Sequence, residues 1–387
     1  MEDRNILKKL TIVTAFYTLN IKNNLFNATT YEEVLNHYYD RGKYVSSLDI
    51  NMVIFCEPNN VGLFTNQRSR NKLKDKTLVI GRSFETLYFH KSINWIKNCF
   101  KTNDKLHGYQ ANKDSPEYII LTLNKLEFLK EIIEKNPFSS EYFVWLDYGI
   151  SHVANIPEKP YDIYWSLNSL KIDKIKLLLM MMVNDKEVEN FNSYFNCLFR
   201  GRVAGGFIGG GGEVIMKLYH KFVKLIYKLF SEEIPCLEES VLSYILKYNW
   251  DIFDVYYGDY CNILQNISGI IKWNHIIEYN INECKNNFYD VQFRDILNKI
   301  FNSANKHNLI LDIPSEKLSM YYDCYYSFSW HLNSRDKTLK IVREIIDLGK
   351  KYETIRKSFS NYSSLKNNIS LIGNKKYIED FNEMLKS

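Results

Sequence analysis

The feature that most constrains this chain is the alternation of short apolar runs with helical patterns over roughly its first two-thirds. Runs rich in β-branched and aromatic residues lie at positions 10–17, 52–56, 77–80, 118–122, 142–146 and 162–165. Between them, residues 84–99 and 124–134 repeat apolar side chains at helix-like spacing. Strands that alternate with helices are typical of an open, mostly parallel α/β sheet flanked by helices, which is the fold class that we expect.

The pattern changes at about residue 276, where longer helical patterns replace the apolar runs. Residues 289–303 and 336–357 are predicted helices, and positions 338–352 carry one broad apolar face. We therefore expect two regions, a catalytic α/β domain over residues 1–275 and a helical C-terminal region over residues 276–387.

Composition narrows the classes of partner. The 50 Lys and Arg against 45 Asp and Glu leave a net charge of only +5, spread along the chain, so charge gives no reason to expect nucleic acid. The seven Cys form no CxxC pair, which is typical of a reducing compartment. The N-terminus lacks a signal-peptide pattern, and the longest apolar run, residues 177–183, is too short to cross a bilayer. We expect a soluble cytoplasmic protein without a transmembrane segment.

The most informative single residue is Asp147, which directly follows the apolar run Phe143 to Leu146. Ligands bind at the carboxyl ends of the strands in open α/β sheets, so a carboxylate there can reach into the binding crevice. It is costly to bury unless it meets a cation or several donors, and Mg²⁺ or Mn²⁺ would supply that cation. The alternative is an Asp that caps the turn before Gly149.

A second candidate is the glycine-rich stretch from Gly205 to Gly212. Such a density permits a close approach between the backbone and a ligand, although neither a phosphate-loop nor a dinucleotide pattern is present. The alternative is a flexible turn before the predicted helix at residues 214–230.

Three more carboxylates lie in segments that could carry chemistry. Glu238 and Glu239 open an apolar helix, where acidic residues are also expected from the helix dipole alone. Asp259 follows Gly258 at the end of a short aromatic strand and is either a second crevice residue or a turn residue.

The order of these segments resembles the HtrL/YibB family, also called WlaTC/HtrL/YibB-like, which is grouped with glycosyltransferases of the GT-A fold. The matching segments are TIVTAFY at 11–17, NK-x2-FL at 124–129, NPF at 136–138, YFVWLDYGISH at 142–152, AGGFIGG at 204–210, EES at 238–240 and YYGDY at 256–260. The resemblance covers roughly residues 10–265. It implies a GT-A-like sheet and the transfer of a sugar from a UDP- or other nucleotide-sugar donor to a hydroxyl of a glycan or protein acceptor.

The resemblance also implies residue roles around the donor phosphates. Asp147 would correspond to the last Asp of the metal-binding DxD motif, with Mn²⁺ or Mg²⁺ as the cation. The sequence departs from that motif because Trp145 stands where the first Asp would be. Lys125 resembles the helix Lys that faces the sugar phosphates, and Asp259 would supply a late metal ligand.

The remaining implied roles concern the nucleotide and the acceptor. Three residues at the end of the first strand would line the nucleotide pocket: Thr14, Ala15 and Tyr17. The glycines Gly205 and Gly206 would let the donor sugar and the acceptor approach the backbone. Glu239 would lie near the acceptor, where a carboxylate can orient or deprotonate the attacking hydroxyl.

Two other functions stay open at this point. The missing first Asp and the helical C-terminal region fit a catalytically inactive GT-A-like module that binds a glycan or a protein. The many Tyr residues fit a protein that stacks on single-stranded nucleic acid, a weaker interpretation.

Overall fold

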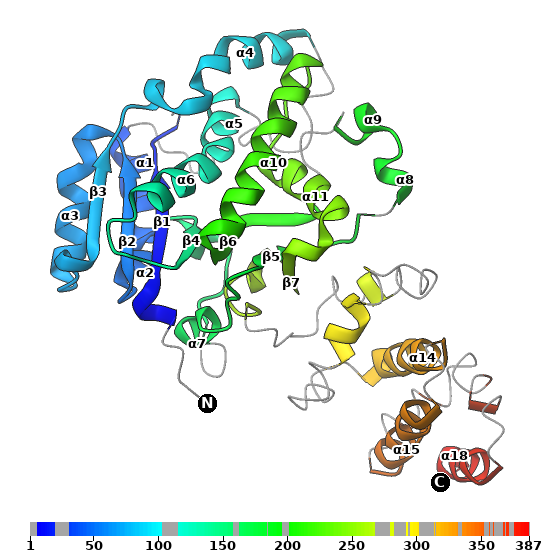
Figure 1. Cartoon of the computed structure of the whole chain (residues 1–387). Coiled ribbons are helices and arrows are strands. Elements are labelled where there is room, and N and C mark those ends of the chain that lie inside the picture. Colours follow the sequence, from blue (N-terminus) through cyan, green and yellow to red (C-terminus); the bar gives the residue numbers. More distant parts are fainter. Residues whose placement is uncertain are drawn as a thin grey trace. The chain divides into compact units, whose positions relative to one another are not determined.

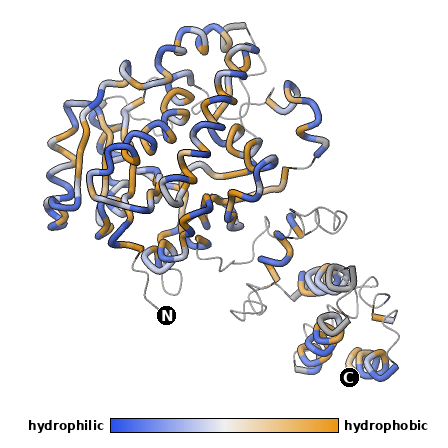
Figure 2. Tube along the Cα trace, viewed as in Figure 1, coloured by the Kyte–Doolittle hydropathy of each residue, from blue (hydrophilic) through white to orange (hydrophobic). Residues whose placement is uncertain are grey.

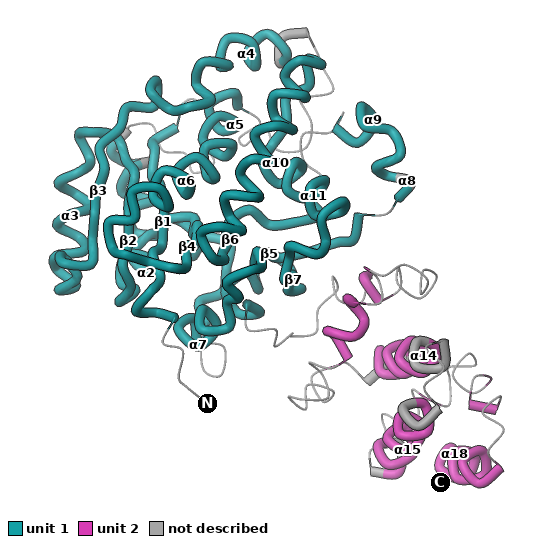
Figure 3. Tube along the Cα trace, in the orientation of Figure 1, with its two compact units in different colours: residues 1–268 teal, residues 269–387 magenta. Residues whose placement is uncertain are grey.

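The computed structural model describes most of the chain, which separates into two compact units, Met1–Ser268 and Gly269–Ser387 (Figure 3). The described residues are 6–19, 31–102, 115–157, 162–183, 185–195, 201–267, 279–281, 292, 295–301, 313, 315–331, 335–351, 356, 359, 367, 369–370 and 375–386.

The first unit is built on one open sheet of seven strands (Figure 1). The strands are β1 (Leu10–Phe16), β2 (Asn51–Cys56), β3 (Thr77–Gly81), β4 (Tyr142–Leu146), β5 (Ile175–Leu179), β6 (Val203–Gly211) and β7 (Phe253–Tyr257). Their order is β3-β2-β1-β4-β6-β5-β7, and β6 alone runs antiparallel to its neighbours. This confirms the predicted mostly parallel α/β sheet.

The reversed direction of β6 decides which residues share an edge of the sheet. The end of β4 lies beside the middle of β6, because Leu146 lies opposite Phe207 and the Asp147 N–H donates to the Gly206 carbonyl. The carboxyl ends of β1, β4 and β7 therefore lie at the same edge as the first residues of β6. The candidate site lies at this edge.

Helices cover both faces of the sheet (Figure 1). They are α1 (Tyr31–Arg41), α2 (Lys43–Ser47), α3 (Val61–Arg70), α4 (Ile93–Thr102), α5 (Pro116–Leu123), α6 (Lys125–Lys135), α7 (Ile163–Leu167), α8 (Asp185–Val188), α9 (Phe191–Phe195), α10 (Gly212–Ser231) and α11 (Glu238–Tyr248). Phe128 of α6 packs on Phe55 and Trp145 at one face, whereas Phe64 of α3 packs on Phe16 at the other. Figure 2 shows the matching alternation of hydrophobic and hydrophilic residues along the helices.

Two of the predicted strands are wrong, because both segments begin with a helix cap. Residues 118–122 lie in α5, where the Ser115 side chain accepts a hydrogen bond from the Tyr118 N–H and Pro116 occupies the first turn. Residues 162–165 lie at the start of α7, which Asp162 caps through the Tyr164 N–H. A capping residue before a short apolar run favours a helix, which the run itself cannot distinguish from a strand.

The glycine-rich stretch is also not a flexible turn, because it forms the fully buried strand β6. Its partner β5 overlaps the apolar run at residues 177–183, which the sequence had shown only to be too short for a membrane span. The single helix expected over residues 84–99 is instead the 3-10 turns η4 (Phe84–Thr86) and η5 (Tyr88–Ser92) followed by α4.

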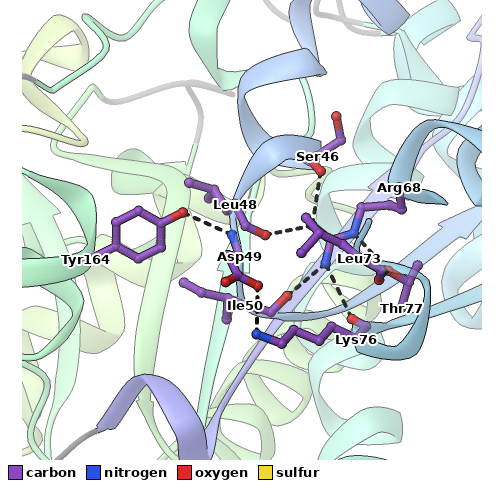
Figure 4. A network of polar contacts seen from close by, with 9 residues as sticks. All are labelled: Ser46, Leu48, Asp49, Ile50, Arg68, Leu73, Lys76, Thr77 and Tyr164. Carbon is purple, nitrogen blue, oxygen red and sulfur yellow. Dashed lines mark hydrogen bonds and ion pairs between the residues drawn. The ribbon is translucent and has the colours of Figure 1, made fainter. Parts of the chain in front are cut away.

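At the opposite edge of the sheet, Arg68 ties together the segments that lead into β2 and β3 (Figure 4). Its side chain is fully buried, and it donates to the Thr77 hydroxyl and to the carbonyls of Ser46, Leu48, Ile50 and Lys76. An arginine has five N–H donors, so all of them find an acceptor. Burial lowers the pKa of Arg68 to about 10.

Nearly all of the described residues of the second unit are helical. Its longer helices are α14 (Ser315–His331), α15 (Arg335–Lys351) and α18 (Lys375–Lys386) (Figure 3). The predicted helix at 336–357 corresponds to α15, and of residues 289–303 the described ones, 292 and 295–301, are helical. No described helix in either unit combines the length and the apolar character that a membrane span requires.

Candidate functional site

Asp147 is the centre of the candidate site. It follows the buried strand β4 at the edge defined above, and its side chain is 37% exposed. Its backbone N–H is bonded to Gly206, so the carboxylate lies beside the first glycines of β6 and is not enclosed by its own turn alone. The Asp147 Oδ1 atom accepts a hydrogen bond of 2.6 Å from the indole N–H of Trp145.

Lys125 lies at the first turn of α6 and extends its ammonium group to the same carboxylate. Its Nζ atom is 3.1 Å from Asp147 Oδ1, 2.7 Å from Glu238 Oε1 and 3.2 Å from the Gly205 carbonyl oxygen. An ammonium group has three N–H donors, and these oxygens engage them all. Burial alone lowers the pKa of Lys125, but the charges of Asp147 and Glu238 outweigh this effect and raise it, so the lysine stays charged.

Glu238 is the buried counterion of Lys125, with a side chain only 5% exposed. It approaches the backbone of β6 so closely that a Cβ atom on Gly205 would lie 2.5 Å from Glu238 Oε1. Only glycine at position 205 leaves room for this carboxylate. The glycine thus serves the close packing of a protein side chain, where the sequence had suggested approach by a ligand.

Glu239 occupies the next position of α11 and is held by two donors. Its Oε1 accepts from the Gly205 N–H at 2.7 Å, and its Oε2 accepts from the Tyr260 hydroxyl at 2.8 Å. Burial and the neighbouring charge of Glu238 raise the pKa of Glu239 to about 7. This carboxyl group is therefore divided between its protonated and ionised forms near neutral pH, as a general base or acid requires.

The charges of the cluster do not balance within the protein. The carboxylates of Asp147, Glu238 and Glu239 surround the single ammonium group of Lys125, so the cluster is negative when all groups are ionised. Such a cluster attracts a cation more readily than a bare phosphate.

The strand-end residues predicted to line a nucleotide pocket are divided between the two faces of the sheet. Tyr17 stacks on Phe128 at the α6 face, the face of Trp145, and alternation along β1 places Ala15 there as well. Thr14 points to the other face and is fully buried. The Tyr17 hydroxyl is buried and has no hydrogen-bond partner in the described part of the chain.

Asp259 caps a short 3-10 helix, and Gly206 allows close packing beside Asp147. Asp259 Oδ1 accepts from the Tyr260 N–H. The Asp259 side chain also accepts from the Asn262 backbone while the Asp259 N–H donates to Asn262 Oδ1, which forms a capping box at η9 (Tyr260–Asn262). A Cβ atom on Gly206 would lie 2.7 Å from Ile150 Cδ1 and 3.1 Å from Ile263 Cδ1, so glycine lets these two side chains pack against β6 beside Asp147.

Asp147 by itself supplies too few ligands to hold a divalent cation. Among the residues that the structure describes, no group of three His, Cys, Asp or Glu side chains could hold a metal ion. Mg²⁺ and similar cations are commonly held by one or two carboxylates, with phosphates and water as the other ligands. Asp147, half-exposed within a negative cluster, provides one such carboxylate.

Residue-by-residue reasoning did not identify three members of the cluster. Glu238 was noted only as a helix-start residue, and Trp145 only as a departure from a motif. Tyr260 follows Asp259 directly, but the structure brings the tyrosine, not the aspartate, to Glu239. The sequence signal was Lys125 itself, which lies in the segment 124–129 and needs carboxylate partners if it is buried.

Comparison with known proteins gives one match. A family model described as "Bacterial protein of unknown function (HtrL_YibB)" matches residues 8–268. No curated protein and no solved structure is significantly similar to the chain. The match covers more than half of the chain and nearly all of the unit that holds the cluster, so this chain belongs to the HtrL/YibB family.

Proposed function

We propose that this protein is a glycosyltransferase that moves a sugar from a nucleotide diphosphate donor to a hydroxyl of a glycan or protein acceptor. The observation that carries the proposal is the meeting of Asp147, Lys125 and Glu239 at the ligand-binding edge of the sheet. A supporting feature is the open, mostly parallel sheet expected of a GT-A enzyme.

In the proposed reaction, the acceptor oxygen forms a bond to the anomeric carbon while the bond from that carbon to the phosphate oxygen breaks. Glu239 takes the proton of the acceptor hydroxyl, because its pKa of about 7 lets the ionised form accept it near neutral pH. Tyr260 and the Gly205 N–H hold both of its oxygens in place. The nucleoside diphosphate leaves as an anion.

The leaving group brings negative charge to a cluster that is already negative. Asp147 would hold Mn²⁺ or Mg²⁺ there, and the cation, when bound, neutralises the developing charge on the phosphate. Lys125 contributes by compensating Asp147 and Glu238, since its donors are engaged by these residues. A second ligand role for Asp259 stays a prediction, as does the cytoplasmic location.

The experiment is a donor screen with the full chain. The protein is incubated with a panel of nucleotide sugars, Mn²⁺ and glycan or peptide acceptors, and the released nucleoside diphosphate is detected by mass spectrometry. We expect release with one donor class and its loss in Asp147→Ala and Glu239→Gln. The matched control is Asp173→Asn, which changes an exposed aspartate before β5. Equal release by Asp147→Ala and the wild type would contradict the proposal.

A second candidate function is an inactive GT-A-like module that binds a glycan or a protein. The observation that favours it is Trp145, which occupies the place of the first carboxylate of the metal motif. Glycan binding without turnover of any donor would support this alternative, whereas donor hydrolysis would exclude it.

A further inference from the structure

Trp145 has an unusual position for a large core residue, because its only polar atom is directed at the central carboxylate. Its side chain is buried, and its indole N–H donates to Asp147 Oδ1 at 2.6 Å. The indole N–H is the only hydrogen-bonding group of a tryptophan side chain, so this bond satisfies the side chain completely. Trp145 stands where the DxD motif has its first Asp, and it thus contacts Asp147, which corresponds to the last Asp.

Trp145 is fixed by the pairing of its strand on both sides and by one stacked ring. Trp145 lies within β4, where it pairs with Val13 of β1 and Ile208 of β6. Its ring stacks on Phe128 with centroids 6.0 Å apart and planes 9° apart, and Phe128 in turn stacks on Tyr17. A hydrogen bond from such a fixed donor restricts the rotation of the Asp147 carboxylate.

The two oxygens of Asp147 are consequently unequal. Oδ1 receives the short bond from Trp145 and lies 3.1 Å from Lys125 Nζ, whereas Oδ2 has the longer contact of 3.3 Å with the same ammonium group. Oδ2 thus has one donor among the described contacts where Oδ1 has two, and it is the oxygen better able to accept another ligand.

We infer that Trp145 is a positioning residue that holds Asp147 so that Oδ2 faces a divalent cation bound to the donor diphosphate. The inference rests on the proposed function. In it, Trp145 orients the Asp147 carboxylate, although it stands where the motif has its first Asp. Groups that orient a metal ligand in this way typically contribute 10- to 100-fold to metal affinity.

The test separates the metal-dependent part of nucleotide binding from the rest. UDP and GDP are titrated into the full chain by calorimetry, with and without Mn²⁺, and the ratio of the two dissociation constants is the metal-dependent gain. Trp145→Phe keeps an aromatic ring against Phe128 but removes the N–H. We expect it to lower the metal-dependent gain roughly 10- to 100-fold and to leave metal-free binding unchanged. Trp165→Phe, on the half-exposed indole of α7, is the matched control and should change neither value.

The outcomes distinguish the inference from the proposed function. A wild type without any metal-dependent gain contradicts the metal-assisted transferase itself. If the wild type shows a metal-dependent gain and Trp145→Phe keeps it, only the inference about Trp145 is overturned. The same holds if Trp145→Phe weakens metal-free and metal-dependent binding equally, because that result indicates a packing role.

A second measurement needs no variant of Trp145. In wild-type protein labelled with ¹⁵N-tryptophan, Mg²⁺ with the nucleotide should shift one indole N–H resonance that the nucleotide alone does not shift. Replacing the other tryptophans one at a time with phenylalanine assigns that resonance by elimination. Absence of a metal-dependent shift in a protein that binds the complex overturns the inference.

Discussion

Replacing Glu239 with glutamine should stabilise the folded protein in alkaline solution and change little in acid. Burial and Glu238 raise the pKa of Glu239 from its usual 4.5 to about 7 in the folded state. The folded protein therefore holds this proton more tightly than the unfolded chain does. The contribution of this proton to the free energy of unfolding therefore decreases as the pH rises from about 4.5 to about 7. Above about pH 7 the contribution changes no further.

The size of the effect follows from the two pKa values. Each pH unit between them corresponds to about 1.4 kcal/mol, so the ionised Glu239 costs the wild type about 3 kcal/mol at pH 8. Glutamine avoids this cost and keeps both contacts. Its carbonyl oxygen accepts from the Gly205 N–H, and its amide group donates to the Tyr260 hydroxyl oxygen.

Urea unfolding of both proteins at pH 5 and pH 8 measures the difference. The free energy of unfolding of Glu239→Gln relative to the wild type should rise by about 2.5 kcal/mol between the two pH values. Glu213→Gln, an exposed glutamate of α10, is the control and should show no such change. A difference that is independent of pH, or a Glu239→Gln protein that is less stable at pH 8, would refute the reasoning. The stabilised variant should also lose transfer activity, because the carboxylate that accepts the proton is gone.

Three further predictions concern the charge cluster and the opposite edge of the sheet. Lys125→Met should lower the free energy of unfolding by about 3–5 kcal/mol because it leaves the buried Glu238 without its counterion. In calorimetry, adding Glu238→Gln should recover part of this loss, and no recovery would show that the ion pair is not the cause. Gly205→Ala should cost about 1–3 kcal/mol and weaken nucleotide binding with Mn²⁺, since its methyl group overlaps Glu238; an unchanged melting temperature and affinity would contradict the packing argument. Arg68→Lys should cost about 2–4 kcal/mol in urea unfolding because three donors cannot satisfy five buried acceptors, whereas a loss below about 0.5 kcal/mol would mean that water replaces them.

Much of the sheet could be predicted from short segments. The apolar runs of β1, β2 and β4 are rich in β-branched and aromatic residues, the periodic helix α6 precedes β4, and Asp147 follows β4 directly in sequence. The mistakes arose where a short run fits either a helix or a strand. At residues 118–122 and 162–165, the deciding signals were the caps Ser115 and Asp162, which lie just outside each run.

The sequence by itself determined the fold class, the family and the place of Asp147 at a strand end, because these depend on periodicity and on neighbouring residues. Only the tertiary structure decided that Lys125 compensates Glu238, that Gly205 makes room for that carboxylate and that Tyr260 holds Glu239. These partners lie far apart in the chain, and the reversed strand β6 brings them to one edge. The raised pKa of Glu239 has the same origin, since burial and nearby charge are properties of the folded molecule.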